Sequence, residues 1–486
     1  MASPNKWMIL AVTTFGAFVA NLDATIVVVA LPTMLVGLGT NIVTLLWTLT
    51  AYMLVSTVFL LPIGRLSDLV GRRRLFLTGF VVFAVGSALC GAAPDGGLLI
   101  AFRCLQGVGG ALVSALGTPI ITEAFPPAEL GTAMGINSLA WVMGAVIGPV
   151  AGGVLVATLG WRSIFYVVVP FALVAAVVGA RVLPEGKNAS RHSRTMDVPG
   201  AAAFALALTA VLLVISESAA WGLASGRSIA LLAVAAVGAA FFVLWELRAT
   251  EPLFDLRLFR SAPFTASQVV VAATSVGYFG ITFLLTFYLQ GGLGLTALGT
   301  GFVMIAMAAP QLLSSPLGGR LSDRVGSALP ILFGIAGMGV GILFLAALPY
   351  RLVLWRILLP LALIATANGF YWPPLVSHVM RSAPPARLGA ASGLFYTFRN
   401  IGFSLSLTLS LALAAASLPP ALATRIFIGV GRAATPALRH ALMASVHDAF
   451  HWFALPFAVG FLVALPLLVA RPGAAATGGV LGPEAP

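Results

Sequence analysis

The chain has 486 residues, of which 60% are hydrophobic and 8% are charged, and its mean hydropathy is +1.06. Soluble proteins carry about 25% charged residues, so this composition excludes a soluble globular domain and predicts an integral membrane protein. The net charge of +12 is typical of nucleic-acid binding, but the basic residues lie in short connectors between apolar segments. We therefore interpret them as topology signals and expect no nucleic-acid partner.

Apolar segments long enough to cross a bilayer recur along the whole chain. A helical span needs about 20 residues, and these segments are too long for barrel strands. Fourteen segments qualify: residues 8–35, 42–63, 74–93, 98–124, 131–157, 162–183, 198–216, 228–247, 264–290, 298–318, 328–349, 353–380, 388–418 and 450–471. The excess of Lys and Arg in alternate connectors, strongest at residues 72–74 and 181–194, predicts that both termini are cytoplasmic. We expect a multi-pass protein of the plasma membrane, in a bacterium the inner membrane, with a long external connector at 418–449.

The first predicted span contains a carboxylate, Asp23, near its centre. A charge at that depth costs on the order of 2.5–3.5 kcal/mol, so it must be compensated or used. Arg103 in the fourth predicted span is the candidate partner, because at about 1.5 Å per residue both side chains fall at the same depth in a core about 30 Å thick. We expect Gln106 and Asn21 to solvate this pair. A plain interhelical hydrogen bond that fixes the first span is the alternative.

A charged, glycine-containing segment, GRLSDLVGRRR at residues 64–74, joins the second and third predicted spans. We expect Gly64 and Gly71 to permit a tight connection, and Asp68 to accept hydrogen bonds from a helix N-terminus or to pair with Arg72. A contact that forms on only one side of a transport cycle would bias one conformation. A simple positively charged topology anchor is the alternative.

Small residues gather in the fifth predicted span. The set comprises Gly144, Gly148, Pro149, Gly152 and Gly153. Glycines at four-residue spacing permit close approach of a neighbouring helix, and the proline introduces a kink. Ordinary packing between spans is the alternative.

The chain repeats itself at a nearly constant offset. The repeated segments are GRLSDLVG (64–71) with GRLSDRVG (319–326), LGTAMGI (130–136) with LGAASGL (388–394), and more weakly FRCLQ (102–106) with WRILL (355–359). Three segments in one order indicate a parallel internal duplication, in which the second loop motif keeps Asp323. The loop follows the second and the tenth span, so two spans must be inserted between six-span halves. We predict an all-α membrane protein with fourteen transmembrane helices: an N-terminal six-helix half (1–197), an inserted helix pair and linker (198–262), and a C-terminal six-helix half (263–486).

Arg399, within RNIG at residues 399–402, lies inside a span of the second half. Aromatic side chains could line a central site and accept varied substrates through apolar contact, although aromatic residues in spans usually serve packing or interface anchoring. The candidates are Trp141, Tyr278, Phe283, Tyr371, Trp372 and Tyr396. Three further titratable residues lie near span ends, where we interpret them as interfacial or structural: Glu123, Glu217 and His378.

Together these motifs resemble the major facilitator superfamily, in its fourteen-span drug:proton antiporter branch. The similar segments are the loop GRLSDLVGRRR, the span-four segment RCLQGVGGA (103–111), the span-five antiporter segment GAVIGPVAGG (144–153), and the span-one segment LDATIVVVALP (22–32). The branch usually has Asn where this chain has Val28, and RNIG also resembles a pattern of the branch. The resemblance implies contact between the first and fourth spans, alternating access between the halves, and a seal or hinge at the span-five glycines.

The sequence therefore predicts a proton-coupled antiporter that exports lipophilic or amphipathic small molecules, with Asp23 as the titrating group. Its partners are then the small-molecule substrate, protons and the lipid bilayer, and no oligomer is implied. A dedicated transporter of one metabolite, self-produced antibiotic or lipid shares every motif and stays open. A non-transporting sensor is disfavoured, because the sequence has no sizeable soluble output segment. We expect no enzyme, no cofactor and no metal, because the sequence lacks a phosphate-binding loop, a catalytic triad pattern and a metal-type Cys/His cluster.

Overall fold

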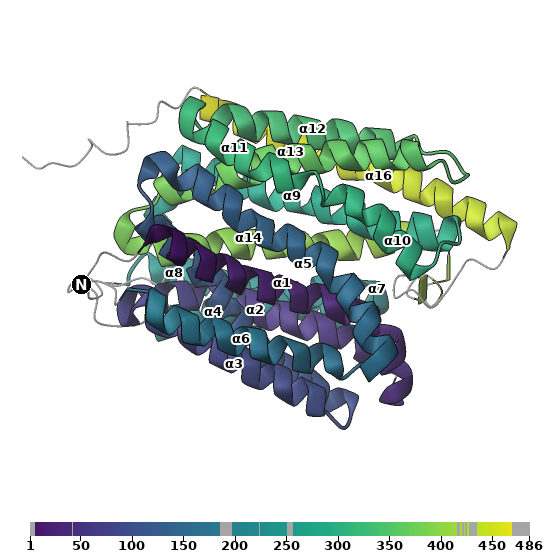
Figure 1. Ribbon diagram of the computed structural model, residues 1–486, viewed down its shortest axis with the longest axis horizontal. Coiled ribbons are helices and arrows are strands. Elements are labelled where there is room, and N and C mark those ends of the chain that lie inside the picture. The colour runs from purple at the N-terminus through teal and green to yellow at the C-terminus, as the bar shows by residue number, and fades with distance from the viewer. Residues whose placement is uncertain are drawn as a thin grey trace, which may run out of the picture.

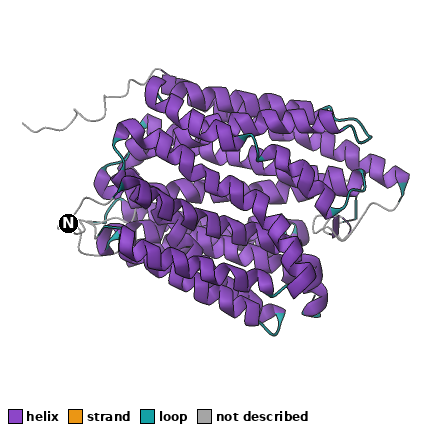
Figure 2. Cartoon of the chain, viewed as in Figure 1, coloured by secondary structure: helices purple, strands orange, loops and turns teal. Residues whose placement is uncertain are grey.

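The computed structural model describes residues 5–40, 42–184, 197–222, 224–249, 256–415, 418–419, 422, 425–426 and 435–468. Within these residues the regular structure is helical, without strands (Figure 2). Lipid offers no water to backbone N–H and C=O groups, and helices satisfy these groups internally. Thirteen helices in the described part of the chain are long and apolar enough to cross a membrane. The chain is an all-α, multi-pass membrane protein.

The helices follow the chain in a regular order (Figure 1). The first eight are α1 (Lys6–Gly37), α2 (Ile42–Val70), α3 (Arg72–Ala92), α4 (Gly96–Ala124), α5 (Leu130–Leu159), α6 (Ser163–Val182), α7 (Val198–Trp221) and α8 (Gly226–Glu246). The others are α9 (Ala262–Thr286), α10 (Ala297–Met304), α11 (Gln311–Val325), α12 (Ala328–Ala346), α13 (Leu354–Arg381), α14 (Leu388–Ala415) and α16 (Pro436–Ala464). Short 3-10 helices are η1 (Pro127–Glu129), η2 (Leu256–Arg260), η4 (Ile305–Met307), η5 (Pro385–Arg387) and η6 (Leu465–Leu468), and a π-helical turn, η3 (Phe287–Gly292), extends α9.

Two predicted spans differ in the structure. A third, at 388–418, forms α14 as predicted, although α14 is not among the thirteen helices counted over the described residues. The span at 298–318 is divided, because Pro310 has no N–H to continue a helix and α11 starts after it. The last helix begins at Pro436 instead of near residue 450, because the side chain of Thr435 caps it and proline suits the first helical position. The predicted external connector is correspondingly shorter.

The helices gather in two groups with two helices between them. In Figure 1, α1 to α4 and α6 lie in the lower part of the view, α9 to α13 and α16 in the upper part, and α5 and α14 between. Helix α1 packs on α5, α3 on α4 and α6, α9 on α14 and α16, and α12 on α13 and α16. Two pairs of helices, α2 with α14 and α5 with α11, join the groups, while α7 and α8 pack on each other.

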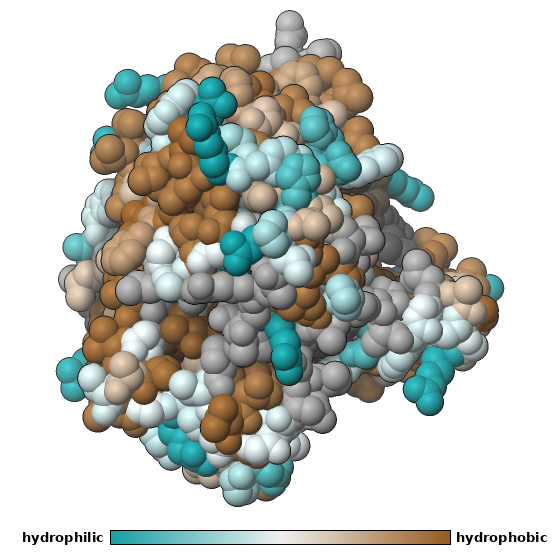
Figure 3. All heavy atoms as spheres, turned by 90° about the vertical axis from the view of Figure 1, so that its right-hand side faces the viewer, coloured by the Kyte–Doolittle hydropathy of each residue, from teal (hydrophilic) through white to brown (hydrophobic). Residues whose placement is uncertain are grey.

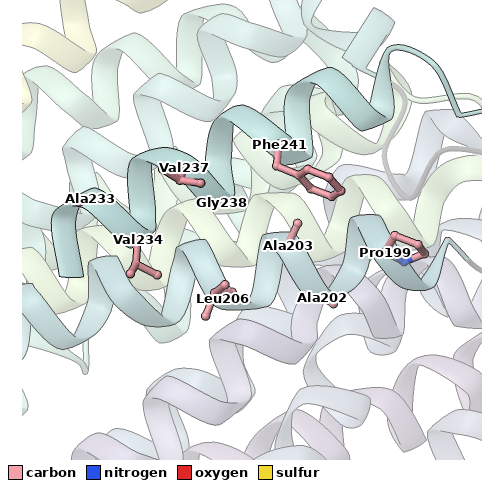
Figure 4. Close-up of a pocket in the computed structure, with 9 residues that line it drawn as sticks. All are labelled: Pro199, Ala202, Ala203, Leu206, Ala233, Val234, Val237, Gly238 and Phe241. Carbon is pink, nitrogen blue, oxygen red and sulfur yellow. The ribbon is translucent and has the colours of Figure 1, made fainter. Parts of the chain in front are cut away.

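Large apolar side chains cover much of the outside. Val237 of α8 is 70% exposed, and Leu247, which directly follows α8, is 68% exposed. Figure 3 looks at the right-hand end of Figure 1 and shows hydrophobic residues around much of the outline, with scattered hydrophilic ones. An apolar groove of about 630 Å³ runs between residues 199–206 of α7 and 233–241 of α8 (Figure 4). An apolar outer surface of this kind suits contact with the lipid core. The residues that line the groove are all uncharged, so the groove contains none of the candidate charged residues.

Candidate functional site

A buried ion pair links α1 to α4. Arg103 Nη1 donates to Asp23 Oδ2 at 2.8 Å and to Gln106 Oε1 at 2.6 Å, and Gln106 Nε2 donates to Asp23 Oδ1 at 2.8 Å. Asp23 and Gln106 are 0% exposed and Arg103 is 1% exposed. The three side chains close a ring of hydrogen bonds from which solvent is excluded, and they are called the Asp23 cluster below.

Helix α2 completes the surroundings of Arg103. The Thr48 carbonyl accepts from Arg103 Nε at 3.1 Å, and the Tyr52 ring centroid lies 4.4 Å from the guanidinium carbon. A desolvated cation over an aromatic face is stabilised by about 2 kcal/mol. Sequence reasoning missed both residues. Their signal was present, because polar side chains four residues apart share one face of an apolar helix.

Asn21, which we expected to solvate the pair, has other partners. Its Nδ2 donates to the Trp141 carbonyl of α5 at 2.5 Å, and Thr25 Oγ1 donates to the Gly144 carbonyl at 2.9 Å. Residues two apart on a helix point to different sides. Asn21 therefore joins α1 to α5, while Asp23 faces α4.

Glycines of α5 permit its close contact with α1. Three of them face α1 at four-residue spacing: Gly144, Gly148 and Gly152. A Cβ atom at Gly148 would lie 2.9 Å from Thr25 Cβ, closer than real side chains approach. Gly153, which we expected on the same face, has no atom within 4 Å, because consecutive helix residues point about 100° apart. The side chain of Pro149, and with it the predicted kink, lies outside the described residues.

The first copy of the repeated motif lies where α2 meets α3, an end of the bundle called the Arg72 end below. Arg72 Nη2 donates to Asp68 Oδ1 at 2.8 Å and to the Pro385 carbonyl at 3.3 Å, and its Nη1 pairs with Glu123 of α4. The Asp68 carboxylate also faces backbone N–H groups in the first turn of α14. The motif thus joins α2, α3, α4 and the start of α14.

Gly64 does not form the connection that we expected. Helix α2 continues to Val70, because Gly71 N still donates to the Ser67 carbonyl in helical fashion. Only Gly71, with φ of 105°, makes the turn. Gly64 instead packs against α14, where an added Cβ would lie 2.8 Å from the carbonyl carbon of Gly389.

The second copy of the motif uses different partners at the same end. Asp323 of α11 accepts from the backbone N–H groups of Gly131 and Thr132 at 2.9 and 2.8 Å, in the first turn of α5. It also accepts from the Thr132 hydroxyl at 2.9 Å and from Arg381 Nη2 of α13 at 2.7 Å. Free N–H groups and the helix dipole favour a carboxylate there. Thr132 and Arg381 were not among the predicted residues, because only the fold brings α5 and α13 to α11.

Arg399 of α14 is surrounded by aromatic rings. Its guanidinium carbon lies 4.6 Å from the Trp141 ring centroid of α5, 5.2 Å from Phe279 of α9 and 5.5 Å from Trp372 of α13. Its Nη1 donates to Asn400 Oδ1 at 3.3 Å. Within the described part of the chain, no carboxylate pairs with it. This set of residues is called the Arg399 site, and sequence reasoning missed Phe279.

The remaining aromatic candidates divide into two kinds. Tyr278 and Phe283 are partly exposed. Tyr371 and Tyr396 are 2% and 5% exposed, and their hydroxyls are hydrogen-bonded to threonines of α9 and α4. We expected both tyrosines to line a cavity, but they pack between helices. Tyr371 points away from its neighbour Trp372, because consecutive residues of a helix point about 100° apart.

The alternative titratable residues lie apart from the Asp23 cluster. Glu123 pairs with Arg72 at the Arg72 end, and His378 is partly buried in the last turn of α13. Glu217 lies just beyond the predicted span at 198–216, near the end of α7. Burial raises the pKa of Glu217, and a hydrogen bond with Trp47 opposes this. The strongly basic connector at 187–194 lies outside the described residues.

The sequence matches the model of the Major Facilitator Superfamily over residues 13–407. It is 33% identical over 440 residues to the Multidrug resistance protein Stp of Mycobacterium tuberculosis, covering 90% of this chain and 81% of that protein. It is 30% identical over 413 residues to the Riboflavin transporter RibZ of Clostridioides difficile, covering 85% and 89%. The crystal structure of the human organic anion transporter MFSD10 (TETRAN) aligns with a TM-score of 0.67 at 16% identity, covering 94% of this chain and 100% of that chain, which shows a shared fold.

Proposed function

We propose, from the premise that this chain belongs to the Major Facilitator Superfamily, that it is a proton-coupled antiporter that exports lipophilic or amphipathic small molecules. Relatives named for multidrug resistance support this substrate class. The observation that carries the proton coupling is the Asp23 cluster, a carboxylate enclosed with an arginine in the bilayer core. The finer assignment, to the fourteen-span drug:proton antiporter branch, belongs to the same proposal.

Protonation of Asp23 would change which conformation is preferred. The deprotonated carboxylate holds α1 to α4 through Arg103 and Gln106. A proton on Asp23 removes the counterion of Arg103, and an unpaired buried charge is strongly unfavourable. The protein then favours a conformation in which α1 and α4 separate enough for Arg103 to be solvated. Because the cluster is enclosed here, proton exchange requires that movement, which links proton access to the transport cycle.

The proposal includes a division into two halves, 1–197 and 263–486, with an inserted pair at 198–262. Reciprocal contacts support it. Gly64 packs on Gly389, and Gly131 packs on Gly319, so the two stronger pairs of repeated segments contact each other across the halves. We place the Arg72 end and both termini in the cytoplasm, following the basic residues there. In this conformation both contacts are closed, so the central site would open to the opposite side of the membrane.

Transport by everted membrane vesicles tests the proposal. Respiration acidifies the vesicle interior, and an antiporter releases protons when its substrate is added on the outside. We expect at least one of ethidium, tetracycline and fluorescein to collapse the pH gradient in vesicles that contain the protein, and all three to leave it intact in vesicles that lack it. An undisturbed gradient with every compound, at normal abundance of the protein, would contradict proton-coupled export of this substrate class.

A dedicated transporter of one metabolite is the second candidate. The similarity to RibZ, which is named for riboflavin transport, favours it. The same vesicles separate the two candidates when riboflavin is added to the panel. A response to a single compound supports the dedicated transporter, and responses to several unrelated compounds support the broad exporter.

A further inference from the structure

The charge around Arg399 is unbalanced. Arg103 has a carboxylate at 2.8 Å, whereas Arg399 contacts three aromatic rings and the neutral amide of Asn400. No described carboxylate pairs with Arg399. Cation–π contacts offset only part of the cost of a charge in the bilayer core. The site therefore carries one uncompensated positive charge.

The groups beside Arg399 add hydrogen-bonding capacity without negative charge. Gln311 Nε2 donates to Tyr278 Oη at 2.8 Å, and Asn400 Nδ2 donates to Thr57 Oγ1 of α2 at 3.0 Å. Amide and hydroxyl groups of this kind orient polar atoms of a ligand. They supply no counterion, so the positive charge stays available to a ligand.

The residues of the Arg399 site are not completely covered by protein. Arg399, Trp141, Trp372 and Phe279 are each partly exposed, although they come from α14, α5, α13 and α9 and meet within 5.5 Å of the guanidinium carbon. The Asp23 cluster is completely buried by comparison. Because all four residues keep part of their surface exposed, protein does not completely cover the place where the four helices converge. The rings of Trp141 and Trp372 form flat apolar walls beside it.

We propose that Arg399 is the anion-binding group of the substrate site, and that the protein prefers planar aromatic substrates that carry a carboxylate or phenolate. A guanidinium pairs with a carboxylate through two parallel hydrogen bonds, and indole rings stack on flat aromatic systems. A cationic substrate of the same shape meets repulsion from Arg399. The inference rests on the proposed transport function, because it names the substrate class of that central site.

Equilibrium binding to the full-length protein in lipid nanodiscs tests the inference. The probes share one three-ring scaffold: 9-anthracenecarboxylate, its neutral carboxamide, and 9-(aminomethyl)anthracene, which is cationic. We expect the carboxylate to bind at least about tenfold more tightly than the ammonium compound, which corresponds to about 1.4 kcal/mol. Arg399→Gln is expected to remove the advantage of the carboxylate over the carboxamide, and Arg399→Lys to retain part of it.

Arg356→Gln is the matched control. Arg356 also lies over a tryptophan, 5.3 Å from the Trp355 ring centroid, but it is exposed at the start of α13. This variant is expected to keep the full preference for the carboxylate. Equal or tighter binding of the ammonium compound, an unchanged preference in Arg399→Gln, or no binding of the carboxylate would each overturn the inference. Because binding needs no gradient, a preference for the anion without pH-driven transport would contradict proton coupling and leave the inference intact.

Discussion

Arg103 and Arg399 both lie within predicted spans, and their surroundings differ. Arg103 is enclosed with Asp23 and Gln106 and is 1% exposed. Arg399 lies in a ring of aromatic side chains, partly exposed, and no carboxylate of the described residues pairs with it. An arginine that is paired with a buried carboxylate can control a conformational equilibrium, because protonation of the carboxylate breaks the ion pair. An arginine without a counterion can bind a substrate, because an anionic ligand supplies the missing negative charge.

The largest expected effect is a difference in stability between Arg103→Gln and Arg399→Gln, the same substitution made at both arginines. Arg103→Gln leaves the Asp23 carboxylate buried without its cation, which costs about 3–5 kcal/mol. Arg399→Gln leaves no carboxylate unpaired, so we expect a much smaller loss. Thermal unfolding of both variants in one detergent measures the difference. Adding Asp23→Asn to Arg103→Gln should restore most of the lost stability, and equal losses in the two single variants would remove the distinction between the arginines.

The second repeated motif, centred on Asp323, tests how a paired carboxylate holds helices together at the Arg72 end. Asp323→Asn weakens charge-assisted hydrogen bonds to the first turn of α5 and to Arg381, each contributing about 1.5–3 kcal/mol. We expect α5 and α11 to separate at the Arg72 end. Spin labels at Glu129 and Arg324 should then show longer distances. Asp95→Asn, which changes only the N-cap of α4, is the control and should leave the distances unchanged.

The close contact of α1 with α5 positions Asp23, so its disruption tests whether the cluster depends on packing. Gly148→Val would force side-chain atoms into Thr25, and such overpacking costs about 1–3 kcal/mol. Gly153→Val is the matched control, because no atom lies within 4 Å of that position. A lower unfolding temperature is expected for Gly148→Val alone. The same decrease in both variants would mean that valine disturbs α5 wherever it is placed.

Glu217 provides the smallest expected effect and tests a rival site for the proton. Burial raises its pKa above the ordinary value of about 4.3, so the folded protein binds this proton more tightly than the unfolded chain does. Stability from this group is therefore present at low pH and is lost as the pH rises through the window between the two pKa values. Glu217→Gln should slightly raise the unfolding temperature above that window and leave pH-driven transport intact. Loss of pH-driven transport would make Glu217 a participant in coupling.

The sequence predicted the spans well, because lipid requires long apolar helices and each such segment is visible by itself. The prediction failed where a local signal competed, as at Pro310, which divides one span, and at Thr435, which starts the last helix early. Gly64 was misjudged for the opposite reason. Gly64 permits close packing against α14, which is remote in the chain, whereas a glycine near the end of a span more commonly forms the connecting turn.

The sequence indicated which polar and aromatic residues belong to the candidate sites, but for several of them it did not indicate which residues they contact. Depth along two helices made a contact of Asp23 with Arg103 possible, and the structure places them at 2.8 Å. No sequence pattern shows which way a side chain turns about its helix, so Asn21 and Tyr371 were given the wrong neighbours. The aromatic rings around Arg399 come from three other helices far apart in the chain, and only the fold shows that no carboxylate of the described residues joins them.

The central claim, that Asp23 serves the proton and Arg399 serves the substrate, is tested most directly in proteoliposomes with labelled 9-anthracenecarboxylate. Two modes are compared: exchange of labelled for unlabelled probe without a gradient, and uphill transport driven by a pH gradient. Asp23→Asn keeps the size and hydrogen-bonding capacity of the side chain but does not titrate, so we predict normal exchange without driven transport. Arg399→Gln should weaken the apparent affinity for the anion in both modes. Driven transport by Asp23→Asn with the pH dependence of the unmodified protein would contradict the account.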